Sequence, residues 1–251
     1  MPILVLMRHG ATLWGQENRF AGWGDTPLSD GGFNEAKRAG HVLTKANFSF
    51  DVCYVSELSR AKQTLSTLIE NGLTIGNDIQ FDWRLNERHY GALQGETRAA
   101  MVEKYGNNQV VEWRRSYTAT PPQLPENDPR WLEQLQRLPN LSLEQQPKTE
   151  SMAAAANRVA PVWANYITSD LKSGKRVLVV AHTSSIRGLA RAIEGLSDEV
   201  SESFRVATAI PLVYKFDDDL KVVNKADLKD GLSDSIRYWS NQLKPRKLGW
   251  I

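Results

Sequence analysis

The chain has 251 residues, of which 41% are hydrophobic and 24% are charged, a balance typical of globular proteins that bury a core. Its 31 lysines and arginines against 29 aspartates and glutamates leave a net charge of +2, too small to indicate nucleic-acid binding, so any basic site must be local. The single cysteine, Cys53, excludes an internal disulfide and a cysteine cluster for zinc or iron–sulfur ligation. No apolar run approaches the roughly 18 residues of a membrane span. The five apolar residues 3–7, with no basic stretch before them, do not meet the requirements of a secretory signal, so we expect a cytoplasmic protein.

The first third of the chain predicts strands that alternate with helices. The continuous apolar run over residues 3–7 predicts a buried parallel strand, and residues 52–55 predict a second strand. A helix capped by Ser29 or Asp30 is expected to run to about residue 43, and another from residue 60 to about residue 69. The predicted core positions of these two helices are Phe33, Ala36, Ala39, Leu43, Ala61, Leu65, Leu68 and Ile69.

The middle of the chain has a different pattern. Residues 83–95 are predicted as a loop, residues 101–117 as a helix, and the proline-rich residues 121–147 as an irregular segment. Such long irregular segments in compact proteins are either functional or mobile linkers. We therefore interpret residues 96–147 as a lid-like insertion, followed by a long helix over residues 152–171 that Pro161 bends.

The last third returns to strand and helix. Residues 177–181 predict a second strongly buried strand, residues 186–194 a helix, and residues 212–216 and 220–223 a closing hairpin. The alternation predicts an α/β fold with a mostly parallel sheet flanked by helices. We expect one domain over residues 1–251, with a mobile C-terminal tail from about residue 228.

Polar residues follow both strongly apolar strands. His9 comes after Arg8 at the end of the first strand, and His182 comes before Thr183 and Ser184 at the end of the later one. The carboxyl ends of parallel strands meet at one edge of a sheet, where the following helices point unpaired N–H groups at a ligand. The two imidazoles, the guanidinium group and the hydroxyl groups are therefore expected to converge on one anion-binding site.

These residue types suit phosphoryl transfer. An imidazole nitrogen can attack phosphorus when arginines neutralise the phosphoryl oxygens, and this chemistry requires no metal. Arg60, which opens the helix after the second strand, is expected to face the same site, and Glu87 is the best-placed carboxylate for general acid–base catalysis. Further guanidinium groups are available on Arg88, Arg98, Arg114 and Arg115. The adjacent arginines Arg114 and Arg115 suit a small ligand with two anionic groups.

Each of these residues also has an interpretation that involves no phosphoryl transfer. Either histidine alone is more often a structural residue, and Glu87 alone could be an ion-pair partner of Arg84 or Arg88. Residues 22–24 lack the third glycine of a dinucleotide-binding turn, and no glycine-rich loop ends in Lys-Ser or Lys-Thr. A zinc site formed by His9, His182 and Glu87 is disfavoured because no closely spaced pair of ligands supports it.

From residue 3 to about residue 216 the chain resembles the histidine phosphatase superfamily and, within it, the cofactor-dependent phosphoglycerate mutases. The similarity rests on Arg8-His9-Gly10, on residues 17–20, 22–23 and 28–29, on the block of residues 85–95, and on Trp113-Arg114-Arg115, among other segments. The resemblance implies a three-layer fold in which His9 carries a phosphoryl group. It also implies that Arg8, Arg60 and His182 bind that group, and that Glu87 moves the proton.

The same resemblance implies a function. The enzyme would interconvert 3-phosphoglycerate and 2-phosphoglycerate, with 2,3-bisphosphoglycerate as phosphoryl primer and no metal. Its partners would be a small phosphorylated acid and further copies of the chain, as a homodimer or homotetramer, with neither nucleic acid nor membrane. The expected substrate-binding residues are Thr12, Gly15, Ala21, Gly22, Arg88, Tyr90, Arg98, Arg114, Arg115, Thr183 and Ser184.

The sequence departs from the mutase pattern around the expected ligand. Gly15 replaces an asparagine, Ala21 a threonine, Thr183-Ser184 a Gly-Asn pair, and Arg98 a lysine. Each lost hydrogen bond to a charged group costs roughly 1.5 to 3 kcal/mol. Two alternatives to a mutase follow: a phosphohistidine phosphatase that acts on a small phosphorylated acid or sugar, and a catalytically weak paralogue that binds phosphorylated ligands.

Overall fold

The alternation of side chains along β1 (Ile3–Arg8) divides the interior into two cores. In the computed structural model, which describes residues 1–229, the odd-numbered apolar residues of β1 pack with helices α2 (Asp30–Lys45) and α3 (Ser59–Glu70). Its even-numbered apolar residues pack with α7 (Met152–Val162) and α9 (Thr183–Glu194). A strand that is buried on both faces needs the continuous apolar run that the sequence contains.

Within residues 1–229, the sheet has six strands in the order β3-β2-β4-β1-β5-β6. β1 pairs in parallel with β4 (Arg176–Ala181), and β2 (Ser49–Val55) pairs in parallel with both β4 and β3 (Thr74–Phe81). β5 (Leu212–Phe216) and β6 (Val222–Asp227) form a hairpin that extends the other side of the sheet in antiparallel fashion. The first strand has the predicted bounds, whereas the second begins at Val222 rather than at residue 220, because Leu220 lies in the turn with φ of 59°. The predicted fold class, an α/β fold with a mostly parallel sheet flanked by helices, is confirmed.

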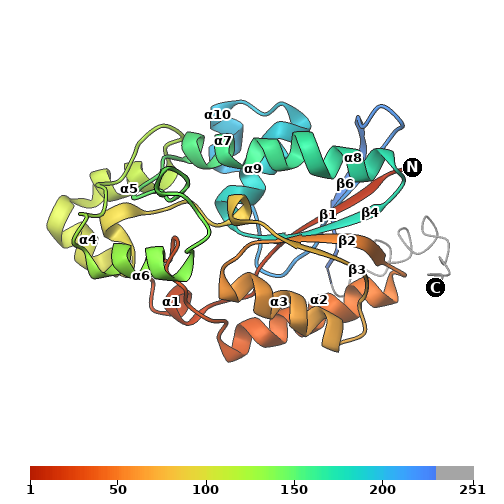
Figure 1. The fold of residues 1–251 in the computed structure, drawn as a ribbon, viewed down its shortest axis with the longest axis horizontal. Coiled ribbons are helices and arrows are strands. Elements are labelled where there is room, and N and C mark those ends of the chain that lie inside the picture. The colour runs from red at the N-terminus through yellow and green to blue at the C-terminus, as the bar shows by residue number, and fades with distance from the viewer. Residues whose placement is uncertain (230–251) are drawn as a thin grey trace.

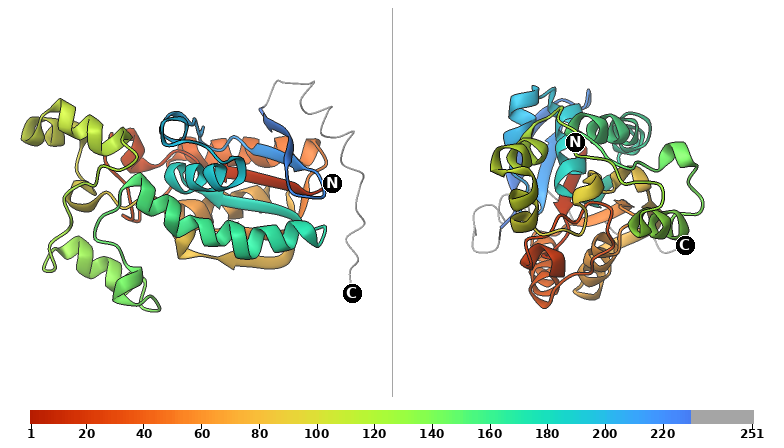
Figure 2. Two further views of the ribbon diagram at one scale, coloured as in Figure 1. Left: turned by 90° about the horizontal axis from the view of Figure 1, so that it is seen from above. Right: turned by 90° about the vertical axis from the view of Figure 1, so that its left-hand side faces the viewer.

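The helices cover the sheet on both faces and build out one end of the molecule. Figure 1 shows α2 and α3 below the sheet and α7, α8 (Thr168–Lys172) and α9 above it. In Figures 1 and 2, α4 (Arg98–Tyr105), α5 (Asn107–Arg115) and α6 (Pro129–Arg137) extend from the end opposite the N-terminus. The remaining short elements are α1 (Leu13–Gln16), α10 (Asp198–Ser203), the 3-10 turns Trp83–Leu85, Gly91–Leu93 and Leu143–Gln145, and the π-helical turn Trp163–Ile167.

Several predicted helix features are wrong. Gly106, with φ of 80°, interrupts the helix predicted over residues 101–117 and separates α4 from α5. The segment 121–147, predicted as irregular, contains α6, which begins with an Asp128 cap and Pro129 in its first turn. In α2 and α3, Phe33 and Ile69 are 39% and 42% exposed rather than in the core. The helix capped by Ser29 is confirmed, since its hydroxyl accepts a hydrogen bond from the Gly32 N–H.

Two further differences concern elements that the sequence pattern left out or only approximated. β3 was not predicted, because this edge strand has mostly polar, half-exposed residues. The long helix predicted over residues 152–171 is three segments, and the π-helical turn follows Pro161. The predicted C-terminal tail lies, from residue 230 on, outside the described residues.

Two glycines allow the start of α2 to pack against the loop that follows β1. A Cβ atom on Gly32 would lie 1.9 Å from the carbonyl oxygen of Ala11, and one on Gly10 would lie 2.3 Å from the carbonyl oxygen of Gly32. Because backbone atoms form both contacts, no side chain can move aside to relieve them. The loop that carries His9 is thus held at its position by close backbone contact.

We expect Gly32→Ala to lower the free energy of unfolding by about 1 to 3 kcal/mol, measured by urea denaturation, because the added methyl group forces the backbone apart. The control is Gly31→Ala in the same helix turn, where the new Cβ would meet only the Ser29 hydroxyl, at 3.7 Å. That variant should be neutral or slightly more stable than the wild type. Equal destabilisation in both variants would contradict the packing argument.

A buried histidine fastens the inserted segment to the loop before α4. His89 accepts a hydrogen bond from the Gly91 N–H at Nδ1 (2.9 Å), and its Nε2 contacts the side-chain oxygen of Gln134 on α6 at 3.0 Å. An amide oxygen only accepts, so Nε2 carries the proton and the ring is neutral. Burial lowers the pKa of His89 to about 4.

This pKa predicts how stability changes with pH. The unfolded chain protonates the imidazole near pH 6.5, whereas the folded protein does so only near pH 4, so stability falls as pH falls between these values. The loss reaches roughly 3 kcal/mol at pH 4. In urea denaturation, the free energy of unfolding of His89→Asn should therefore fall less steeply with falling pH than that of the wild type, by about 1.4 kcal/mol per pH unit. The control, His41→Asn, removes an exposed imidazole. A decline as steep in His89→Asn as in the wild type would refute the prediction.

Candidate active site

The two histidines that follow β1 and β4 lie side by side. The parallel register pairs Arg8 with Ala181, and the His9 N–H donates to the Ala181 carbonyl at 3.1 Å. The centroids of the His9 and His182 rings are 4.9 Å apart, and the ring planes are inclined by 56°. Both residues are buried. The convergence expected from the ends of two parallel strands is therefore observed.

The hydrogen bonds of His9 determine which ring nitrogen is free. Nδ1 lies 2.7 Å from the carbonyl oxygen of Gly10, and because a carbonyl only accepts, Nδ1 carries the proton. The Gly10 N–H in turn donates to the hydroxyl of Thr64 at 3.1 Å, which holds this peptide in place. A neutral His9 ring therefore carries its lone pair on Nε2, the nitrogen that can act as a nucleophile.

His182 is held at both ring nitrogens. Arg60 donates through Nε to Nδ1 at 3.2 Å, so the proton of the neutral ring lies on Nε2 and points to the hydroxyl of Ser56, 2.7 Å away. Ser56 then donates to the side-chain oxygen of Asn86 at 2.7 Å. This chain of hydrogen bonds fixes the orientation and the tautomer of His182.

Burial and positive charge keep both rings neutral. Burial lowers the pKa of His9 well below its ordinary value, and the guanidinium groups of Arg60 and Arg8 lower it further. The same causes lower the pKa of His182. Burial also lowers the pKa of Arg60, to about 10, so this group remains charged at neutral pH. The site thus combines unprotonated imidazoles with one buried cation, Arg60, and one half-buried cation, Arg8.

Arg60 is oriented by a turn of the preceding chain. Its two terminal nitrogens donate to the carbonyl oxygens of Gly24 (2.9 Å) and Gly22 (2.7 Å). Between these glycines, the buried Trp23 donates its indole N–H to the carbonyl of Glu87 at 2.6 Å. The turn therefore holds the guanidinium group and the loop that carries the carboxylate in one arrangement.

The carboxylate of Glu87 lies at the N-terminus of α9. Its Oε1 accepts the backbone N–H groups of Arg88 (2.8 Å) and Ser184 (3.0 Å). Burial by itself raises the pKa of Glu87, but these hydrogen bonds and the charges of Arg60 and Arg8 outweigh it, and the pKa is below its ordinary value. Glu87 is therefore a carboxylate at neutral pH and can accept a proton.

A buried arginine from α7 supports the Glu87 loop. Arg158 forms an ion pair with Glu150 at 2.7 Å, with both side chains less than a tenth exposed. It also donates to the backbone carbonyls of Arg84 (2.7 Å), Asn86 (3.1 Å) and Glu87 (3.1 Å). Removing one member of such a pair leaves an uncompensated buried charge. Arg158 is thus a positioning residue that the sequence pattern did not reveal.

The free side of His9 opens into a cavity of about 590 Å³, which we call the arginine-lined cavity. Within residues 1–229, eight arginines and two glutamates contribute to its wall. The lining residues are Arg8, His9, Thr12, Gly15, Arg19, Phe20, Ala21, Gly22, Arg60, Glu87, Tyr90, Arg98, Arg114, Arg115, Thr183, Arg187, Glu202, Ser203 and Arg205. This excess of positive charge favours an anionic ligand with more than one charge.

Most of the predicted site residues line this cavity, but three do not. His182 lies behind His9 and Arg60. Arg88 is buried, stacks on Tyr90 at 4.6 Å and donates to the Arg114 carbonyl at 3.1 Å. Ser184 is also buried and gives its backbone N–H to Glu87. The roles assigned to the predicted residues in catalysis and binding remain predictions.

Six lining residues were not predicted as site residues: Arg19, Phe20, Arg187, Glu202, Ser203 and Arg205. For Arg187 a signal existed, because it stands four residues after Thr183 on the same face of a helix. Arg205 follows α10, a helix that was not predicted. The chain segment that brings it to the cavity has no local motif.

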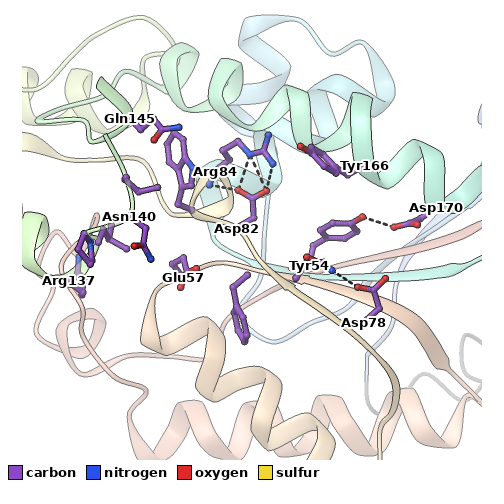
Figure 3. Close-up of a pocket in the computed structure, with 16 residues that line it drawn as sticks. Tyr54, Glu57, Asp78, Asp82, Arg84, Arg137, Asn140, Gln145, Tyr166 and Asp170 are labelled. Atoms are coloured by element: carbon purple, nitrogen blue, oxygen red, sulfur yellow. Dashed lines mark hydrogen bonds and ion pairs between the residues drawn. The ribbon is translucent and has the colours of Figure 1, made fainter. Parts of the chain in front are cut away.

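A second and larger cavity, of about 730 Å³, lies beside β3 and the segment after α6 (Figure 3). Figure 3 shows two of its acidic groups with partners. Asp82 forms an ion pair with Arg84, 2.6 Å away, and Asp170 accepts a hydrogen bond from the Tyr54 hydroxyl, 2.5 Å away. Neither histidine of the pair lines it. We therefore place the candidate active site in the arginine-lined cavity, although it is the smaller of the two.

Residues 1–229 lack both a membrane-spanning helix and a cluster of metal ligands. No helix in this part of the chain is long and apolar enough to cross a membrane. Nor does this part contain a group of three or more histidine, cysteine, aspartate or glutamate side chains placed to hold a metal ion.

Comparisons with known proteins identify relatives of this arrangement. A mycobacterial glucosyl-3-phosphoglycerate phosphatase, solved as a complex with VO3, is 26% identical with a TM-score of 0.64, and the match covers 86% of this chain and 93% of that chain. An alpha-ribazole phosphatase from Shigella flexneri is 19% identical with a TM-score of 0.66, and the match covers 90% and 96%, respectively; at this identity it supports the fold alone.

The family model for branch 1 of the histidine phosphatase superfamily matches residues 4–128 and 120–227, a span that includes both strand-end histidines and the Glu87 loop. The chain therefore belongs to the histidine phosphatase superfamily, branch 1.

Proposed function

We propose that this chain is a phosphatase that transfers the phosphoryl group of a small phosphorylated acid or sugar to His9 and then to water. The observation that carries the proposal is the free Nε2 of a neutral His9 beside the guanidinium groups of Arg8 and Arg60. The similarity to a glucosyl-3-phosphoglycerate phosphatase, at 26% identity, supports hydrolysis over isomerisation.

In the first step, Nε2 of His9 attacks phosphorus, the N–P bond forms and the ester P–O bond breaks. Arg8 and Arg60 neutralise the phosphoryl oxygens. Arg8 suits this role, since it lines the arginine-lined cavity together with His9. The substrate binds as its phosphate monoanion and first gives its proton to the Glu87 carboxylate. Glu87 then gives this proton to the leaving oxygen.

In the second step, water attacks phosphorus, gives a proton to the Glu87 carboxylate, and the N–P bond breaks to release inorganic phosphate. His182 acts on the transferred group only through Arg60: its Nδ1 accepts a hydrogen bond from the Arg60 Nε and so orients the guanidinium group. Neutral imidazoles suit both steps, since a protonated His9 would have no lone pair for phosphorus.

A mutase is the second candidate. Arg98, Arg114 and Arg115 line the same cavity as His9, as expected for a site that holds the carboxylate of a phosphoglycerate during transfer. In that case 2,3-bisphosphoglycerate would prime His9, and phosphoglycerate rather than water would accept the phosphoryl group. The loss of side-chain donors at Gly15 and Ala21 in the cavity wall favours hydrolysis, since bound intermediates would be held more weakly.

The test measures inorganic phosphate released from p-nitrophenyl phosphate and 3-phosphoglycerate, with and without 2,3-bisphosphoglycerate. We expect release that does not depend on added bisphosphoglycerate, together with an acid-labile, base-stable phosphate on the protein. His9→Ala should lose both, with kcat/KM lower by at least roughly 1,000-fold. The control, His41→Ala, removes an exposed histidine and should behave as the wild type.

The other outcomes are equally informative. Transfer of label from 2,3-bisphosphoglycerate to phosphoglycerate without release of phosphate would select the mutase. If the phosphorylated compounds stabilise the protein against unfolding but no phosphoprotein forms, the chain is the paralogue that binds phosphorylated ligands without reacting. Phosphate release that survives in His9→Ala would overturn the phosphohistidine mechanism.

A further inference from the structure

Arg137, the last residue of α6, contacts the turn that orients Arg60. One terminal nitrogen of the Arg137 guanidinium group donates a hydrogen bond to the carbonyl oxygen of Trp23. Trp23 lies between Gly22 and Gly24, and the carbonyl oxygens of these two glycines accept hydrogen bonds from Arg60. The peptide group that Arg137 holds therefore lies between the two peptide groups that hold Arg60.

The carbonyl oxygen of Trp23 depends on this contact. Trp23 is fully buried, and the hydrogen bond from Arg137 is the only one that its carbonyl oxygen accepts from residues 1–229. A buried carbonyl group that loses its partner bears the cost of its own desolvation, which favours a rearrangement of the backbone. Loss of the Arg137 side chain is therefore expected to change the conformation of the turn.

α6 also holds the other backbone group of Trp23, through an intermediate residue. The Trp23 N–H donates to the side-chain oxygen of the buried Gln94 at 2.8 Å. Arg130, near the start of α6, donates to the carbonyl oxygen of Gln94 at 2.6 Å. The two arginines stand seven residues apart, which is two turns of the helix, so one face of α6 carries both contacts.

The charge of Arg137 has no partner of opposite sign in the described part of the chain. No carboxylate there forms an ion pair with it, and its Nε is buried without a hydrogen-bond partner. Burial lowers the pKa of Arg60, and the charges of Glu87 and Asp25 raise it. The charge of Arg137 lowers that pKa again, so the two guanidinium groups lie near each other. An unpaired cation beside another cation stabilises the fold little, whereas its hydrogen bond to Trp23 determines the position of the turn.

The position of Arg60 matters at two atoms of the candidate active site. Its Nε donates to Nδ1 of His182 at 3.2 Å, and its side chain lines the arginine-lined cavity together with His9. A shift of the carbonyl groups that bind its terminal nitrogens would therefore turn the guanidinium plane away from both.

We propose that Arg137 is a positioning residue: its hydrogen bond to Trp23 holds the turn that orients Arg60, and so determines how well Arg60 neutralises the transferred phosphoryl group. This inference rests on the proposed phosphatase function. Arg137 does not line the arginine-lined cavity but the second cavity, where Figure 3 labels it. It therefore acts on the reaction through the turn and not by contact with the substrate.

The test replaces Arg137 with methionine, which keeps an unbranched side chain and removes the charge and the donors. We expect kcat to fall about 10-fold for both p-nitrophenyl phosphate and 3-phosphoglycerate, because Arg60 acts on the phosphoryl group that these substrates share. KM should change less than about threefold, since the other arginines of the cavity are retained. Arg137→Lys should recover part of the loss, because it keeps the charge and one donor group.

The control variant is Arg84→Met, which removes the same charge from the wall of the same second cavity. Arg84 forms an ion pair with Asp82 at 2.6 Å, and its side chain does not contact the turn around Trp23. We expect its kcat to stay within about twofold of the wild type. Urea denaturation shows whether each variant is folded under the assay conditions. If Arg137→Met does not fold, Arg137→Gln takes its place with the same expectations.

A spectroscopic measurement separates positioning from a general loss of stability. The ¹⁵N resonance of His182 Nδ1 reports the hydrogen bond from Arg60. In Arg137→Met we expect this resonance to move towards that of an imidazole nitrogen that accepts no hydrogen bond, and in Arg137→Lys to return part of the way. In Arg84→Met it should stay where it is in the wild type.

The inference fails if either kcat or the His182 resonance is unchanged in Arg137→Met, or if Arg84→Met shows the same losses. The proposed function fails separately, if the wild type hydrolyses neither substrate. In that case the His182 resonance, which is measured without substrate, alone decides whether Arg137 orients Arg60.

Discussion

The candidate site depends on two unprotonated imidazoles held among buried arginines at the carboxyl ends of adjacent parallel strands. Burial and the charges of Arg60 and Arg8 disfavour protonation of His9 and His182, and hydrogen bonds at Gly10 and Ser56 determine where each ring keeps its single proton. A lone pair on Nε2 of His9 beside fixed cations is the arrangement that attack on phosphorus needs.

The rest of the chain supplies the supports for this arrangement. The turn around Trp23 binds the terminal nitrogens of Arg60 and also contacts the Glu87 loop. Arg158, paired with Glu150, holds the same loop from the side of α7. These contacts come from segments far apart in sequence, so the turn around Trp23 and helix α7 both contribute to the geometry of the site. The positive charge of the arginines that line the cavity favours an anionic ligand.

The sequence predicted the parts of the molecule that a local pattern determines. β1 and β4 are continuous apolar runs, and because parallel strands end at one edge, the meeting of His9 and His182 followed from those runs. β3 escaped prediction because an exposed edge strand needs no apolar alternation, and the break at Gly106 depends on a positive φ that periodicity does not reveal. Arg158 and Arg187 are held by tertiary contacts, for which the sequence has no local signal beyond helical spacing.

The most direct test of this account is ¹⁵N NMR of the histidine side chains of the protein at about pH 6, below the ordinary histidine pKa of roughly 6.5. The account predicts a neutral His9 ring with its proton on Nδ1 and an unprotonated Nε2, both unchanged down to that pH. A doubly protonated His9 ring at pH 6, or a proton on Nε2 in place of Nδ1, would contradict it.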